Sequence, residues 1–213
     1  IFEPDSPWMK ITKEECAQLV EREIESIAET YREGLFQSGS VEDYRRRRIT
    51  DICASVCFSV VEQVRAGHIS QISPEIAFGR RGDLPPIEME AGGQKIYIEG
   101  VIDRVDYLTD GRIKIVDYKT GNESFDIEEA AAGYRLQLML YLNAACGSGR
   151  KPAGVFYFKI KNPIVKSINR LTSEDIKNLI EKELKMSGLV LMDEKVIHAL
   201  DSEFTKTSNV IPI

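Results

Sequence analysis

The stretch EGVIDRVDYLTDGRIKIVDYKTG, residues 99–121, contains two strand-like runs on either side of a short turn. The runs cover residues 96–107 and 112–119, and Thr109-Asp110-Gly111 lies between them. Glycine in the last position suits the left-handed conformation that a three-residue hairpin loop requires. The pattern therefore predicts an antiparallel β-hairpin.

This hairpin would place two carboxylates and an ammonium on one face. Strand pairing continued outward from the turn puts Asp103 opposite Asp117, with Lys119 two residues further along the second strand. The other members of this face are apolar: Val101, Val105, Ile113 and Ile115. Like charges on such a face destabilise a sheet, and a hard cation such as Mg²⁺ or Mn²⁺ removes the conflict. The pattern indicates metal-assisted hydrolysis, whereas a register slip of one residue would separate the carboxylates.

Three spaced segments resemble the consecutive motifs of RecB-like nucleases in the PD-(D/E)XK superfamily. They are GVIDRVD at 100–106, VDYKTG at 116–121 and QLMLYL at 137–142. Residues 134–161 and 185–191 resemble more narrowly the C-terminal nuclease domain of AddB-type subunits of ATP-dependent helicase/deoxyribonucleases. The resemblance covers residues 70–213 well and the first 70 loosely. It implies a restriction-endonuclease-like α/β core, with a mixed central sheet flanked by helices.

The resemblance also implies a function. It predicts a Mg²⁺- or Mn²⁺-dependent exodeoxyribonuclease that cuts single-stranded DNA ends during double-strand-break repair and recombination, beside an AddA-type partner subunit. A catalytically inactive module that binds DNA or scaffolds a partner subunit is the alternative, and a CRISPR-associated exonuclease is a third possibility. No Walker A motif occurs, so we expect ATP to be handled elsewhere.

Site residues follow from the matched motifs. The resemblance assigns catalysis to Asp103, Asp117, Lys119, Gln137 and Tyr141. It assigns metal binding to Asp103, Asp117 and the backbone carbonyl of Tyr118, with Glu75 holding a metal-bound water; a strand-edge glutamate is the alternative for Glu75. The expected DNA contacts are Arg104, Lys119, Gln137, Arg80 and Arg81.

Two of these residues also follow from helical spacing. Gln137 and Tyr141 are one turn apart, and an amide within LQLMLYL favours a site-facing role over a place at the core edge. Arg104 and Asp106 alternate onto the hairpin's other face, where we expect Asp106 to be structural and paired with Arg104.

Two family features have no counterpart in the sequence. The resemblance implies an iron-sulfur cluster, yet the cysteines at 16, 53, 57 and 146 lack the expected closely spaced triplet. We therefore expect a cluster in the full-length protein but not its ligands here, and we interpret Cys53 and Cys57 as small core residues. Neither His68 nor His198 matches the metal-site histidine of the family, which predicts slow or absent activity in this chain alone.

Composition is compatible with this interpretation. The chain has 213 residues, 43% of them hydrophobic and 29% charged, and a net charge of −6, which allows a nucleic-acid enzyme with local basic groups. No signal peptide or transmembrane-length run occurs, so we expect a cytoplasmic protein. The start at Ile1 suggests a fragment of a longer chain. We expect one domain, with a helical part (1–70), a catalytic core (71–165) and a helical extension (166–213).

The remaining elements are predicted from capping signals and periodicity. Helices are expected from Thr12 to about Tyr31, from Ser38 or Ser40 to about Val64, from Asp126 to about Ala145, and from Thr172 to Met186; strands are expected over 72–78 and 154–160.

Overall fold

The computed structural model describes residues 6–31, 39–121, 123–147, 149–161 and 172–213. These residues form two compact units. The sheet unit contains the described residues of 66–159 and 185–213, and the helical unit contains those of 6–65 and 160–184. Among the described residues, no helix is both long enough and apolar enough to cross a membrane.

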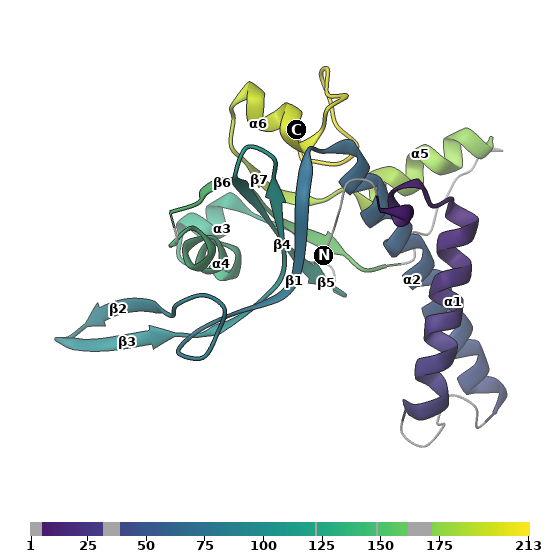
Figure 1. The fold of residues 1–213 in the computed structure, drawn as a ribbon, viewed down its shortest axis with the longest axis horizontal. Helices are drawn as coiled ribbons and strands as arrows, with labels where there is room; N and C mark the ends of the chain where they lie inside the picture. Colours follow the sequence, from purple (N-terminus) through teal and green to yellow (C-terminus); the bar gives the residue numbers. More distant parts are fainter. Residues whose placement is uncertain (1–5, 32–38, 122, 148, 162–171) are drawn as a thin grey trace. The chain divides into compact units, whose positions relative to one another are not determined.

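The helical unit is built around two long helices that lie side by side (Figure 1). Its elements are η1 (Pro7–Lys10), α1 (Lys13–Thr30), α2 (Ser40–Ala66) and α5 (Ser173–Leu184). Thr12 starts α1 with a capping box, since its hydroxyl accepts from the amide of Glu15 while that carboxylate accepts from the amide of Thr12. Near the end of α2, Arg65 donates to the carbonyls of Met9 and Ile11 and so anchors the segment before α1.

The sheet unit has one mixed sheet of five strands in the order β1-β4-β5-β6-β7. The bounds are β1 (Ile69–Phe78), β4 (Gly100–Leu108), β5 (Arg112–Lys119), β6 (Lys151–Lys159) and β7 (Ser187–Val190). Only β5 and β6 run parallel; the other neighbouring pairs are antiparallel. A mixed sheet with flanking helices confirms the predicted α/β class.

The predicted register of the central hairpin is confirmed. Arg104 pairs with Val116 and Tyr107 pairs with Ile113, so the next pair outward is Asp103 with Asp117. Gly111 has a φ of +84°, and its amide donates to the carbonyl of Leu108 at 3.0 Å. The left-handed turn therefore sets the register that the site depends on.

Helices α3 (Ile127–Ala131) and α4 (Gln137–Cys146) lie beside the sheet (Figure 1). The core of this unit joins residues of α4 to residues of the sheet: Phe78, Ile102, Val105, Ile113, Ile115, Leu138, Ala144, Ala145, Val155 and Tyr157. Three of the four apolar residues predicted for the carboxylate face are therefore buried. Val101, the fourth, is 48% exposed because it lies beyond this cluster, near the end of the sheet.

The run predicted as one strand, residues 96–107, is divided. Its first part belongs to β3 (Gln94–Ile98), which pairs with β2 (Ile87–Ala91) in a separate ribbon. The chain leaves this ribbon at Glu99 and enters the main sheet at Gly100. Figure 1 shows the ribbon extending away from the sheet.

The helix predicted from Asp126 to Ala145 is also wrong as one element. Asp126 does cap a helix, since its carboxylate accepts from the amides of Glu128 and Glu129, but that helix ends at Ala131. Gly133 and Arg135 both have left-handed φ values, +85° and +52°, which no α-helix can include. A new helix then starts at Gln137.

Two further elements were not predicted. They are β7, which forms an edge of the sheet, and α6 (Glu194–Leu200), which Asp193 caps by accepting from the amides of Lys195 and Val196. The predicted cap of α5 is present, because Thr172 and Asp175 accept from each other's backbone amides.

The sheet unit also contains a buried charged cluster of Arg104, Asp106 and Lys114, all 2% exposed or less. Arg104 binds Asp106 through two hydrogen bonds of 2.6 and 2.7 Å, and Nζ of Lys114 lies 2.7 Å from the same carboxylate. Burial raises the pKa of Asp106, but the two cations outweigh that effect and hold it below its usual value. The expected pairing of Asp106 with Arg104 is thus present.

Candidate active site

The carboxylate pair lies where β4 and β5 are opposite each other. Oδ2 of Asp103 accepts from the backbone amide of Tyr118 at 2.8 Å, which fixes this side chain across the two strands. Asp117 is only 1% exposed. Burial raises its pKa, and the nearby charge of Asp103 raises it further, while Lys119 opposes both effects. The two carboxylates therefore repel each other in a partly desolvated site.

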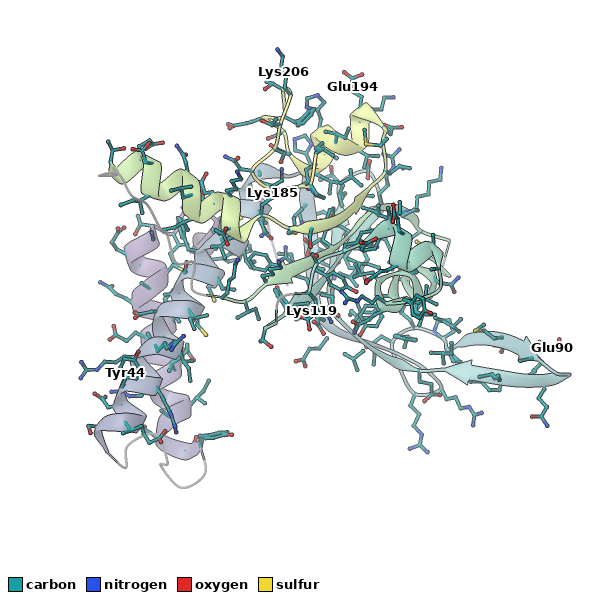
Figure 2. The ribbon with its side chains drawn as sticks, turned by 180° about the vertical axis from the view of Figure 1, so that it is seen from behind. Tyr44, Glu90, Lys119, Lys185, Glu194 and Lys206 are labelled. Atoms are coloured by element: carbon teal, nitrogen blue, oxygen red, sulfur yellow. The ribbon has the colours of Figure 1, made fainter. Side chains whose placement is uncertain are left out.

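Lys119 lies at the end of β5 and is labelled in Figure 2. Its Nζ is 2.6 Å from Oδ2 of Asp117 and donates to Oε1 of Gln137 at 2.7 Å. Burial lowers the pKa of Lys119, but the hydrogen bond and charge of Asp117 outweigh that effect and raise it above its ordinary value. The side chain is thus a fixed, protonated ammonium at neutral pH.

Helix α4 supplies two further polar groups. Gln137 is its first residue, and Tyr141 follows one turn later. Nε2 of Gln137 lies 2.8 Å from the hydroxyl oxygen of Tyr141, so the amide bridges Lys119 and this phenol. The ring of Tyr141 packs edge-on against Phe78, with the centroids 6.0 Å apart. The structure therefore joins the four predicted residues Asp117, Lys119, Gln137 and Tyr141 into one polar chain, with Asp103 beside its carboxylate end.

Sequence reasoning did not single out Tyr157 of β6. It is the register partner of Asp117 in the parallel β5–β6 pair, and Nζ of Lys119 lies 5.1 Å from the centroid of its ring. That geometry is a cation–π contact. The run GVFYFKI predicts only a β-strand, because the neighbour of Asp117 depends on a long-range register.

Glu75 lies on β1 in the register position opposite Asp103, since Pro74 pairs with Arg104 and Ile76 with Ile102. Its φ is +51°, a left-handed conformation that is uncommon for a residue other than glycine. The side chain is exposed, and no group of three acidic, histidine or cysteine side chains with metal-binding geometry occurs among the described residues. Its predicted role at the metal stays a prediction.

Two other predicted DNA contacts lie where the ribbon begins. Arg80 places its guanidinium 4.9 Å from the ring centroid of Tyr97. These two residues, with Arg81 and Glu99, line an open hollow of about 530 Å³. The arginines are exposed, so a DNA contact there remains a proposal.

The expectation that Arg104 contacts DNA is wrong for this structure. Its side chain is 3% exposed and is held by Asp106. Strand alternation places it on the face opposite Asp103, where it fixes the hairpin instead.

Cysteine and histidine positions also separate from the site. Cys57 is exposed, so the prediction of a core residue is wrong there, whereas Cys53 is partly buried. Burial raises the pKa of Cys57 to about 11, with Cys16 and Cys53 adding to the shift. His198 lies on α6, with its ring edge-on to Phe204.

The family model described as "PD-(D/E)XK nuclease superfamily" matches residues 7–208. The chain belongs to this superfamily. Its polar cluster on β4, β5 and α4 therefore coincides with the three segments that resembled the family's motifs. Members of this superfamily generally use divalent metals.

Curated relatives of this nuclease domain share one name, that of the AddB component of the ATP-dependent helicase/deoxyribonuclease. The protein from Alkaliphilus metalliredigens is 37% identical over 96% of the chain, and that from Alkaliphilus oremlandii is 35% identical over 96%. The protein from Thermoanaerobacter sp. is 33% identical over 98%. The chain spans 19% of the length of each of these relatives.

Proposed function

We propose that this domain is a divalent-metal-dependent exodeoxyribonuclease that acts on single-stranded DNA ends. The observation that carries the proposal is the position of Asp103 opposite Asp117, with Lys119 fixed beside them on an otherwise apolar face. The naming of the relatives as components of a deoxyribonuclease supports DNA as the substrate.

The donor set fits a hard divalent cation such as Mg²⁺. Oδ2 of Asp117 is buried and, apart from the ammonium of Lys119, has no hydrogen-bond partner in the described part of the chain. Mg²⁺ is commonly held by one or two carboxylates together with waters and substrate phosphates, so two carboxylates are enough. Asp103, Asp117 and the backbone carbonyl of Tyr118 would hold the ion, and Glu75 would hold one of its waters. A bound ion would polarise the phosphate and acidify a water.

The remaining site residues act on the phosphate and the nucleophile. The ammonium of Lys119 can orient the attacking water and offset the negative charge that develops on the phosphate. Gln137 fixes the position of that ammonium, and Tyr141 fixes the amide of Gln137. Arg80 and Arg81 are proposed contacts to the DNA backbone, together with Lys119 and Gln137.

The wider setting is also part of the proposal. The relatives' name supports work within a helicase–nuclease in double-strand-break repair, in the cytoplasm, beside an AddA-type partner subunit. An iron-sulfur cluster in the full-length protein is kept as a proposal, although the described residues supply no ligand set for it.

The test uses the full-length parent protein. Asp117→Ala and Lys119→Ala should each abolish DNA cleavage and leave DNA-stimulated ATP hydrolysis nearly intact. Asn143→Ala, an exposed change on α4, is the control and should leave both activities unchanged. Loss of cleavage and ATP hydrolysis together in the two site variants would mean that the hairpin is structural.

A further inference from the structure

The segment between α3 and α4 has a conformation that its sequence does not favour. Arg135 has a φ of +52°, and it is one of two residues other than glycine with a positive φ in the described part of the chain. Glycine adopts this conformation without strain, as Gly133 does two residues earlier, whereas a residue with a Cβ is disfavoured. An arginine at 135 is therefore poorly explained by the backbone alone, and strain of this kind often marks functional segments.

Arg135 lies next to the polar cluster of the site. It is two residues before Gln137, whose amide accepts from Lys119. Its positive charge also acts on Tyr157, the residue whose ring lies under the ammonium of Lys119. The guanidinium therefore adds a second positive charge near the proposed position of the scissile phosphate.

The side chains around this position are accessible. Nε of Arg135 lies 2.9 Å from Oε2 of Glu129, yet the arginine side chain is 52% exposed. The preceding residue, Tyr134, is 69% exposed, and its amide donates to the carbonyl of Glu129. An exposed aromatic ring beside an arginine is the combination that binds single-stranded nucleic acid, since every base has a face that can stack.

We propose that Tyr134 and Arg135 hold the DNA strand beside the scissile phosphate. Arg135 binds a backbone phosphate and Tyr134 stacks on an unpaired base. This inference rests on the proposed deoxyribonuclease function and adds to it a contact that favours single strands. Glu129 restrains the guanidinium, and a phosphate must compete with this carboxylate.

The test measures the binding of this chain to a fluorescein-labelled oligothymidylate by fluorescence anisotropy, with Ca²⁺ present and at several salt concentrations. Arg135→Gly removes the charge and also relieves the backbone, so it should bind more weakly without lowering Tm. For a single strand, losing one phosphate contact should reduce the slope of log K against log salt by about 0.7. Arg135→Lys retains the charge and should keep most of the slope.

The other variants separate the two contacts. Tyr134→Ala should weaken single-strand binding at least about fivefold, the lower end of the value of one base stack, and should affect a duplex much less. Glu129→Gln frees Arg135 and should strengthen binding. Lys151→Ala, an exposed change at the opposite end of the sheet, is the control and should change neither affinity nor slope.

The outcomes distinguish this inference from the function beneath it. If the unmodified chain binds the oligonucleotide but Arg135→Gly leaves affinity and slope unchanged, the inference is overturned and the nuclease proposal stands. Equal losses on single strands and duplex for Tyr134→Ala overturn the stacking contact. Failure of the unmodified chain to bind DNA, and to cut it with Mn²⁺, overturns both.

Discussion

The ammonium of Lys119 donates to the amide oxygen of Gln137 at 2.7 Å, and this bond joins the end of β5 to the first residue of α4. Two elements that meet only in the folded sheet unit therefore set the position of one cation. The bond restrains Lys119 from the side opposite Asp117.

Gln137→Ala should lower kcat with little change in KM. The amide positions Lys119 for the transition state and, in this respect, does not contribute to ground-state binding. Losing one positioned hydrogen bond of about 0.5–1.5 kcal/mol corresponds to a loss of roughly 2- to 13-fold in kcat. The measurement is steady-state cleavage of a labelled oligonucleotide, with Asn143→Ala as the control on the same helix. A change in KM alone would show that Gln137 binds substrate instead.

Tyr157→Phe should retain most activity, whereas Tyr157→Leu should not. Phenylalanine keeps the ring face under Nζ of Lys119, and leucine removes it. A cation–π contact of about 0.5–2 kcal/mol predicts a loss of roughly 2- to 30-fold in kcat for leucine. Both variants are compared for cleavage rate and for Tm. Equal loss in the two variants would point to the hydroxyl rather than the ring.

Asp117→Asn should stabilise the metal-free protein at neutral pH. The folded-state pKa of Asp117 is raised, so the native chain holds a proton that the unfolded chain has already lost. The stability of the unmodified protein therefore falls as pH rises through the window between the unfolded and folded pKa values. The variant lacks this loss, and its advantage should disappear below the unfolded pKa, near 3.9. Thermal unfolding in EDTA from pH 3 to pH 8 measures the difference.

Divalent metal should reverse that order. Mn²⁺ that binds only the folded state stabilises the unmodified protein by mass action, and Asp117→Asn should gain much less. In crystals soaked with Mn²⁺, we expect anomalous density within about 2.0–2.4 Å of carboxylate oxygens from both Asp103 and Asp117, the reach of a hard cation. An ion bound elsewhere, with no effect of Asp117→Asn on the metal-induced shift in Tm, would contradict the proposed site.

Asp106→Ala should be far more destabilising than Lys114→Met. The alanine variant leaves Arg104 and Lys114 buried without their shared carboxylate, which costs about 3–5 kcal/mol. Methionine fills the space of Lys114 and leaves the Arg104–Asp106 pair in place, so its effect should stay within about 1.5 kcal/mol. Urea unfolding of the two variants gives the comparison. Similar losses would mean that Lys114 contributes as much as the carboxylate.

The carboxylate site was predictable because its geometry is local. The loop ending at Gly111 fixes the register, and the register brings Asp103 to Asp117 whatever surrounds the hairpin. The family motifs then added Gln137 and Tyr141. Their contact with Lys119 could not follow from helical spacing, since that spacing places the two residues on one face without saying what the face meets.

The missed features depend on partners far away in sequence. Residues 94–98 alternate like the strand that follows, and only their pairing with 87–91 separates them from it. Arg104 was expected to be exposed because its burial requires Asp106 and Lys114 in an interior that the pattern does not reveal. The break before α4 has a local signal in Gly133, but the left-handed Arg135 has none.

The shared carboxylate of Asp106 also bears on how this hairpin forms. Lys114 is its register partner, so a β4–β5 pair shifted by one residue would place the ammonium on the other face, away from this carboxylate. The shifted pair would also separate Asp103 from Asp117. The same error that would spoil the chemistry would therefore strand a charge in the interior, and a misfolded hairpin would be rejected during folding before it could persist as an inactive enzyme.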